Sequence, residues 1–525
     1  MSKSGGVRFS SGRHAGVLVP LFSIPSRRSW GIGEISDLIP LAQWLESSGL
    51  DFVQLLPLNE MQEGQSSPYS ALSAMAIDPV FIAVEDIPDW VATGGNLDAD
   101  DQKTLAHIRG AERIDHANVR RLKNKALRTA FTWFNAHLWG TGDRRDHALH
   151  VFEERESRWI GDYALFRALH DENGGRHWRD WEPGVRDREP GALEAARARL
   201  ETEIRYYTYL QWVADEQWQH VRLGTPRVGL FGDFPFMVSG HSADVWSRQQ
   251  EFDLDASVGT PPDAFSATGQ DWGLPAYRWD VVGASDFAWL RERSWRSAEL
   301  YDGFRIDHLI GFFRTYVRKP GATPGFWPAD ESAQRAMGER LLSLFSESGA
   351  TLIGEDLGTV PDFLRVSLAE HGVPGMKVMR WEREWKVDGQ PFRDPAHYPA
   401  VSVATTGTHD TETLAEWWDG AARDEREALL ALPSLHQAGL QIDDPFSDRV
   451  RDALLSTLYG SGSGLLILPF QDIFGWRDRI NVPALISDLN WTWRLPGPVE
   501  DLLTESGAAA RAGFLHNLSR ANGRA

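Results

Sequence analysis

The sequence contains no cysteine among its 525 residues. This absence excludes a disulfide framework, thiolate metal sites and a cysteine nucleophile. Long apolar runs are also missing, because no window approaches the roughly 18 apolar residues of a membrane span. Residues 1–11 are polar and lack the apolar core of a secretion signal. We therefore expect a cytoplasmic protein with no membrane partner.

Basic residues are outnumbered by acidic ones. The chain has 54 Lys and Arg against 74 Asp and Glu, which gives a formal net charge of −20 at pH 7. Binding to a nucleic-acid backbone needs concentrated positive charge, so we expect no nucleic-acid partner. A neutral substrate fits this balance better, because it does not have to be steered by charge.

Tryptophan, in contrast, is frequent, at 23 residues. Most of these indoles are expected to fill the core. The apolar face of a sugar ring packs well on an indole, however, and a cleft for a chain of sugars needs several aromatic side chains. Two clusters are available for such a cleft, namely Trp178 with Trp181 and Trp417 with Trp418.

Three carboxylate motifs stand in the second half of the chain, each after a run that predicts a buried parallel strand. The runs and the residues that follow them are 301–306 with Asp307, 351–354 with Glu355, and 401–406 with His409 and Asp410. Carboxylates at the ends of successive strands form the active site on the C-terminal face of a (β/α)8 barrel. We therefore predict an α/β fold of the TIM-barrel type with helical and loop insertions.

The rest of the chain is interpreted as part of one catalytic barrel over residues 1–525. Further strands are expected at 52–58, 80–84, 227–235, 374–381 and 464–469. Residues 98–222 have helical periodicity, clearest at 193–220, and are interpreted as a mostly helical insertion. Residues 239–279 are interpreted as a long loop over the active-site cleft. The chain after the last strand is too short for a C-terminal β-sandwich domain of about 100 residues.

The residue types suit chemistry on a glycosidic bond. Retention of configuration needs a carboxylate nucleophile and a carboxylic acid about 5–5.5 Å apart. Arg305 and Asp307 lie on the same face of a strand, so we expect Arg305 to lower the pKa of Asp307 and keep this nucleophile ionised. Glu355 follows an apolar run, and burial is expected to raise its pKa as a general acid. Asp410 is the candidate for stabilising a positively charged sugar ring.

Other interpretations of these residues remain open at this point. Arg305 and Asp307 could form a structural ion pair, Glu355 could cap a helix, and His409 could be a core histidine. The same side chains are also metal-ligand types, but no compact motif such as H-E-x-x-H is present. A hydrolase and a non-catalytic sugar-binding protein are the remaining alternatives. A binding protein would be expected to lose catalytic carboxylates, whereas all three are present here.

The chain resembles the amylomaltases, also called disproportionating enzymes or 4-α-glucanotransferases, of glycoside hydrolase family 77 in the α-amylase clan. The resemblance runs nearly end to end. Besides the three carboxylate motifs, it is carried by Pro20-Leu21-Phe22-Ser23-Ile24, Leu55-Leu56-Pro57-Leu58, Ser67-Pro68-Tyr69-Ser70, Asp162-Tyr163-Ala164-Leu165-Phe166, Gly232-Asp233-Phe234-Pro235, Gly269-Gln270-Asp271-Trp272-Gly273 and Asn490-Trp491-Thr492-Trp493-Arg494.

The resemblance implies a 4-α-glucanotransferase that acts on malto-oligosaccharides and on α-1,4-glucans derived from starch or glycogen. It implies double displacement with retention, no cofactor and no metal. By position, the nucleophile falls on Asp307, the general acid/base on Glu355 and the transition-state stabiliser on Asp410. The implied substrate-binding residues are Tyr69, Asp233, Trp272, Arg305 and His409.

The sequence departs from the family pattern at three places away from the catalytic carboxylates. Ala264 follows Pro261-Pro262-Asp263 where a tyrosine is common, the stretch 309–316 differs from the usual one, and the segment 251–260 looks shortened. We expect such changes to affect donor length, ring formation or the balance between transfer and hydrolysis.

Overall fold

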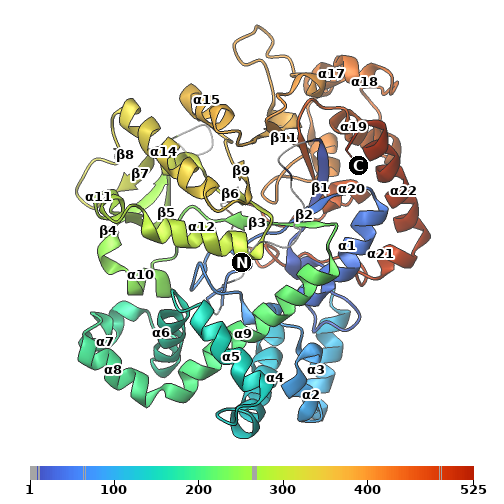
Figure 1. The fold of residues 1–525 in the computed structure, drawn as a ribbon. Coiled ribbons are helices and arrows are strands. Elements are labelled where there is room, and N and C mark those ends of the chain that lie inside the picture. Colours follow the sequence, from blue (N-terminus) through green and yellow to red (C-terminus); the bar gives the residue numbers. More distant parts are fainter. Residues whose placement is uncertain are drawn as a thin grey trace.

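The computed structural model describes residues 9, 12–62, 64–65, 67–262, 269–483, 485 and 487–524. Its centre is a closed barrel of parallel strands in the order β1-β12-β11-β10-β9-β6-β3-β2 (Figure 1). The barrel strands are β1 His14–Leu18, β2 Phe52–Gln54, β3 Gly229–Phe234, β6 Gly303–Ile306, β9 Thr351–Gly354, β10 Gly375–Val378, β11 Ser402–Thr405 and β12 Leu465–Pro469. The predicted (β/α)8 barrel is confirmed.

Two strand predictions need correction. The sequence reading missed β1, a short strand that begins His-Ala-Gly and lacks a run of β-branched residues; its pairing with β2 and β12 closes the barrel. The strand expected at 80–84 is absent, and the short 3-10 helices η3 Pro79–Phe81 and η4 Val84–Asp86 occupy this region. Pro79 stands at the first turn of η3 and the Asp78 side chain accepts from the N–H of Val80, which favours a helical turn over a strand.

Helices cover the outside of the barrel, and after β12 the described residues form helices and loops without a β-sandwich. The helices associated with the barrel and with the segments at its C-terminal face are α1 Leu38–Ser47, α10 Ala243–Ser247, α11 Trp279–Ala284, α12 Ala288–Leu300, α13 Ile310–Phe313, α14 Glu331–Ser346, α15 Asp362–Glu370, α16 Leu414–Gly420, α17 Arg423–Leu430, α18 Pro433–His436, α19 Asp448–Tyr459, α20 Phe470–Phe474, α21 Asp501–Thr504 and α22 Ser506–Ala521. Within the described part of the chain, no helix has the length and apolar character needed to cross a membrane.

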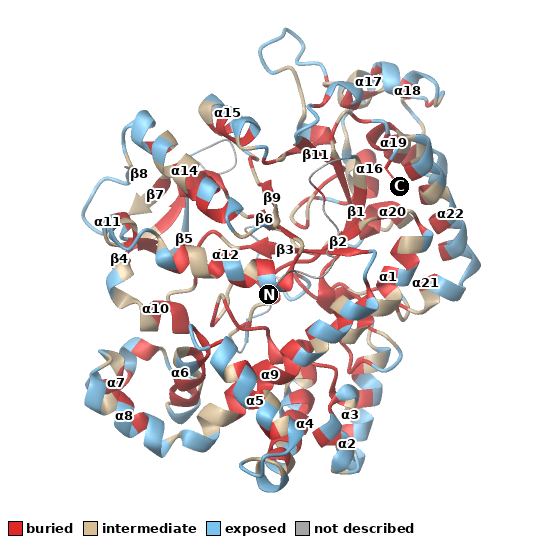
Figure 2. Cartoon of the chain, in the orientation of Figure 1, coloured by how far each residue is buried: buried red, intermediate tan, exposed pale blue. Residues whose placement is uncertain are grey.

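The remaining α-helices lie between β2 and β3. Helix α2 Pro88–Ala92 precedes the segment 98–222 that was predicted to be helical. Within that segment the helices are α3 Ala99–Gly110, α4 His116–His137, α5 Arg144–Arg155, α6 Ile160–Glu172, α7 Pro183–Arg186, α8 Pro190–Arg199 and α9 Glu201–Gly224. The single helix expected at 193–220 is divided at Leu200 into α8 and α9. In Figure 2 the barrel strands are buried, whereas α8 is largely exposed.

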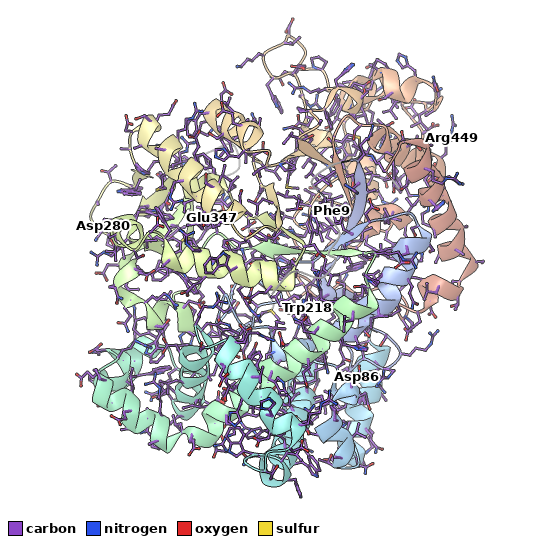
Figure 3. All side chains as sticks on the ribbon, in the orientation of Figure 1. Phe9, Asp86, Trp218, Asp280, Glu347 and Arg449 are labelled. Atoms are coloured by element: carbon purple, nitrogen blue, oxygen red, sulfur yellow. The ribbon has the colours of Figure 1, made fainter. Side chains whose placement is uncertain are left out.

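Helix α9 connects this helical segment to the barrel. The Trp218 indole is fully buried and donates to the carbonyl of Leu300 at 2.9 Å, and Figure 3 shows Trp218 on α9 close to the barrel. One turn later, Arg222 forms a two-pronged ion pair with Asp302, at 2.6 and 2.7 Å, just before β6. This face of α9 therefore holds the strand that carries Arg305.

Where the structure describes them, at 239–262 and 269–279, the residues of the predicted loop contain regular secondary structure. They contain α10, a 3-10 turn and the antiparallel strands β4 Phe252–Thr260 and β5 Gln270–Tyr277, which join β7 Thr315–Arg318 and β8 Gly325–Trp327 in a sheet of order β5-β4-β7-β8. The alternation of apolar residues from Phe252 to Val258 is a strand signal that Gly, Pro and Asp nearby obscured. Asp263 and Ala264 lie outside the described residues, and the division into one barrel, a helical insertion and a covering segment stays a prediction.

The buried position of Trp218 predicts that its removal lowers the free energy of unfolding. Trp218→Ala leaves a large cavity between α9 and the barrel and is expected to lower the free energy of unfolding by about 3–5 kcal/mol. Trp295→Ala, at a tryptophan on α12 that is 39% exposed, is the matched control and should change it by less than about 1 kcal/mol. Urea unfolding followed by circular dichroism measures both, and equal losses in the two variants would contradict the role given to Trp218.

Candidate active site

Backbone pairing places Asp307 and Glu355 at the same end of two neighbouring strands. In the register of β6 and β9, Ile306 lies opposite Gly354. The ladder continues one residue further, because the N–H of Asp307 donates to the carbonyl of Phe234 at 3.0 Å and the N–H of Glu355 donates to that of Ile306 at 3.1 Å. The two carboxylates are therefore held by the sheet itself at the C-terminal face of the barrel.

A single guanidinium connects the carboxylates of this site. Arg305 donates from Nη1 to Asp233 at 2.5 Å, and from Nη2 to Asp307 at 2.8 Å and to Glu355 at 3.1 Å. The Arg305 side chain is only 5% exposed and that of Asp233 is fully buried, whereas the side chains of Asp307 and Glu355 are 26% and 20% exposed. The cation is sealed beneath two carboxylates that remain open to a substrate.

The protonation of the pair differs from the expectation. Burial raises the pKa of Asp307 well above its ordinary value, and the charge of Glu355 adds to this rise while Arg305 opposes it. Burial also raises the pKa of Glu355, but Arg305 and the N–H of His308 outweigh it, so the net pKa lies below its ordinary value. The net direction for Asp307 differs from the prediction because burial outweighs the lowering of its pKa by Arg305, which also serves Asp233 and Glu355. The net direction for Glu355 differs because Arg305 and the N–H of His308, which donates to Glu355 at 2.7 Å, outweigh burial.

Tyr69 links Asp233 to His409 across the site. Its hydroxyl donates to Asp233 at 2.8 Å, so its oxygen is free to accept from Nε2 of His409 at 3.2 Å. The two rings are stacked with centroids 5.5 Å apart. The predicted residues Tyr69, Asp233, Arg305 and His409 thus form one connected group with the catalytic carboxylates.

Asp410 lies on the other side of His409 and is the most exposed of the three candidate catalytic carboxylates, at 44% for its side chain. One of its oxygens is 3.4 Å from Nε2 of His409, and the other accepts from the Asn481 amide at 2.7 Å. Arg479 donates to the backbone carbonyl of Asp410 at 3.1 Å. Sequence reasoning missed Asn481 and Arg479, because they lie about 70 residues away and no local motif marks them.

Aromatic rings border the carboxylates on both sides. The ring of Trp491 packs against those of His409 and Tyr69, at centroid distances of 5.8 and 6.0 Å. On the opposite side, Trp272 on β5 meets His308 edge to face at 4.8 Å. Trp491 stands in a motif that carried the family resemblance without a role, and its role in the structure is to support the His409 and Tyr69 rings.

Comparison with known proteins agrees with this geometry. A family model described as 4-alpha-glucanotransferase matches residues 19–500. The chain belongs to this family, glycoside hydrolase family 77.

Individual members of the family cover nearly the whole chain. The 4-alpha-glucanotransferase of Thermus thermophilus is 32% identical over 520 residues, spanning 95% of this chain and 98% of that protein. The 4-alpha-glucanotransferase of Chlamydia muridarum is 31% identical over 509 residues, spanning 94% and 93%. The amylomaltase of Streptococcus agalactiae, solved in complex with acarbose, has a TM-score of 0.82 and 28% identity, covering 98% of this chain and 99% of that one.

The glycoside hydrolase family 77 site does not use the tryptophan clusters that the sequence suggested. Trp178, Trp181 and Trp418 are buried in the core, with exposures of 3% or less. Trp417 is partly buried beneath the guanidinium of Arg380, 5.2 Å from its ring. The indoles beside the catalytic residues are instead Trp272, which contacts His308, and Trp491 of the Asn490–Arg494 motif, which contacts His409.

The raised pKa of Asp307 predicts how stability changes with pH. A carboxyl whose pKa is higher in the folded state stabilises the fold at low pH, and this contribution is lost as the pH rises through the folded-state pKa. Asp307→Asn cannot ionise, so its thermal midpoint should rise relative to the parent between about pH 4 and about pH 8, by about 1–3 °C at the upper end. Calorimetry across this range checks the trend, and a constant offset at every pH would contradict it.

Proposed function

We propose that this family 77 protein transfers α-1,4-glucan segments from a donor to the 4-hydroxyl of an acceptor glucan or of glucose, with retention of configuration. The observation that carries the proposal is the pair Asp307 and Glu355, which accept hydrogen bonds from the same nitrogen of Arg305. Oxygens that share one donor lie close together, at a separation of the order of the about 5–5.5 Å used by retaining enzymes. An inverting enzyme would need a wider gap to admit a water molecule.

In the first step, Asp307 attacks the anomeric carbon while Glu355 protonates the leaving glycosidic oxygen. The bond from Asp307 to the sugar forms as the glycosidic bond breaks, and the shortened glucan leaves as an alcohol. We propose that the two carboxyls share one proton, in line with the raised pKa of Asp307 and the lowered pKa of Glu355. A glycosidic oxygen beside Glu355 favours that proton on Glu355, where it is donated, and leaves Asp307 ionised for the attack.

In the second step, the ionised Glu355 removes the proton from the 4-hydroxyl of the acceptor. The acceptor oxygen attacks the anomeric carbon, the bond to Asp307 breaks, and a new α-1,4 bond forms. Glu355 is protonated again at the end, so the cycle consumes no acid or base. Transfer rather than hydrolysis requires that water is kept from the covalent intermediate. The contact of Trp272 on β5 with His308, the residue after Asp307, supports a role of this indole in excluding water.

The remaining polar residues hold the sugar whose bond is broken. Asp410 is aligned by Asn481 and is positioned to bind sugar hydroxyls and to stabilise the positive charge on the ring. The Tyr69, Asp233 and His409 group presents a fixed set of donors and acceptors beside it. Arg305 stabilises the carboxylate form of Asp307 when it leaves the sugar in the second step.

Incubation with maltotriose alone tests the reaction. Mass spectrometry is expected to show glucose together with glucans longer than maltotriose, because each transfer shortens one molecule and lengthens another. Asp307→Asn should lower kcat by about 10³-fold or more. Glucose and maltose without longer products would instead make the protein a hydrolase.

Azide rescue tests the separate roles of the two carboxylates. With α-maltosyl fluoride, whose leaving group needs no acid, Glu355→Ala can still form the intermediate on Asp307, and azide then displaces Asp307 to give the α-azide. In Asp307→Ala, azide takes the place of the missing carboxylate and gives the β-azide. The anomeric configuration is read by NMR, and the reverse outcome would exchange the two roles.

A further inference from the structure

An ordered arm leaves the barrel between the strands that lead to the catalytic carboxylates. Residues 379–394, here called the β10 arm, follow β10, which pairs with β9 on one side and β11 on the other. Glu355 follows β9 and Asp410 follows β11. The arm therefore rises from the catalytic face of the barrel, and in Figure 1 it extends beyond α15 and α17.

The base of the β10 arm contacts residues that lie next to Glu355 and close to Asp410 in the sequence. Arg380 donates to the carbonyl of Thr406 at 3.2 Å and pairs with Glu412, two residues after Asp410, at 3.3 Å. On the other side, Lys377 lies 3.7 Å from Glu382 and 3.9 Å from Asp356, the residue after Glu355. Trp381 stands between these two attachments, so its position relative to the catalytic residues is fixed.

The outer part of the β10 arm is a closed hairpin. The N–H of Glu384 donates to the carbonyl of Pro391, and the N–H of Arg393 donates to that of Glu382, both at 2.9 Å. The Arg383 guanidinium lies 3.9 Å from the centre of the Phe392 ring. These contacts close the base of the hairpin.

This hairpin presents indole rings to solvent. Trp381 is 43% exposed and Trp385 is 61% exposed, whereas most tryptophans of the chain are buried. Val387, close to Trp385 at the tip, is 51% exposed. Large apolar side chains that gather on an exposed hairpin are typical of an interaction site.

We propose that Trp381 and Trp385 form an outer binding site for long α-glucan chains, which continues from the catalytic centre along the β10 arm. The inference rests on the proposed function, because the same glucan must reach Asp307. A neutral sugar chain suits the surface, since both arginines of the hairpin are paired, Arg383 with Glu425 at 3.2 Å and Arg393 with Glu384 at 3.0 Å, and Lys386 and Asp388 at the tip carry opposite charges. Two indoles and one valine are also far smaller than the roughly 800 Å² that each partner of a stable protein complex buries.

The test compares long and short substrates in Trp385→Ala. The ratio of kcat/KM for amylose to kcat/KM for maltotriose should fall by about threefold to tenfold, mainly through a higher KM for amylose. Trp385→Phe keeps an aromatic face and should recover part of this preference. Trp295→Ala, on the outer helix α12, is the control and should keep the ratio of the parent protein.

Direct binding provides the second readout. In the Asp307→Asn background, calorimetric titration with maltoheptaose is expected to show weaker binding, by a similar factor, when Trp385→Ala is added, and circular dichroism verifies that the variant is folded. An unchanged amylose-to-maltotriose ratio together with unchanged maltoheptaose affinity would overturn the outer site. Failure of the proposed function has a different signature, because the parent protein would then transfer no sugar from maltotriose.

Discussion

The active site depends on one buried cation that serves three carboxylates. Arg305 contacts Asp233, Asp307 and Glu355 with its two terminal nitrogens, and it is almost completely shielded from solvent. Such a geometry needs the planar fork of a guanidinium, which a point charge on a lysine does not reproduce. One positive charge does not balance three negative ones, and this imbalance, together with burial, favours a proton on the pair of Asp307 and Glu355. The reaction proposed for this site uses that proton.

The helices inserted before β3 support the site from outside the barrel. Tyr69 lies in a long segment after β2, and the end of this segment is held from the helical side. Gln211 on α9 both accepts from the N–H of Ile77 and donates to its carbonyl, at 2.9 and 2.8 Å. Arg120 on α4 forms a two-pronged pair with the fully buried carboxylate of Asp78, at 2.8 and 3.1 Å. A segment without regular structure is thereby fixed tightly enough to position a hydroxyl between Asp233 and His409.

The sequence was sufficient for the barrel and for the residues that end its strands. Asp307, Glu355 and Asp410 were recognisable because each directly follows a run of buried residues, and this relation is local. The same local reasoning failed for β1, whose strand character comes from closing the barrel with β12 rather than from its own composition. It also failed for Asn481, which reaches the site from a distant loop and carries no signal of its own, and for Trp491, whose motif supported the family resemblance without indicating a role.

The direction of the pKa shifts in the active site was also not predictable from neighbouring residues in the sequence. Arg305 and Asp307 are two residues apart, which suggested a simple pair with a lowered carboxyl pKa. The structure adds Asp233 and Glu355 from other strands, and these compete for the same guanidinium. The direction of a pKa shift in a crowded site depends on all the charges that the fold brings together, and only the three-dimensional arrangement contains that information.

The ladder bonds of Asp307 and Glu355 have a consequence for how this catalyst can diversify. The distance between the two carboxylates is a property of the sheet, because their backbone N–H groups bond to residues of adjacent strands. The hairpins and loops that surround them add recognition without setting that distance. Exchange of loops between homologues can therefore change which glucans are accepted without altering the residues that cleave the bond. Substrate specificity and catalytic chemistry can thus change independently, both in evolution and in protein engineering.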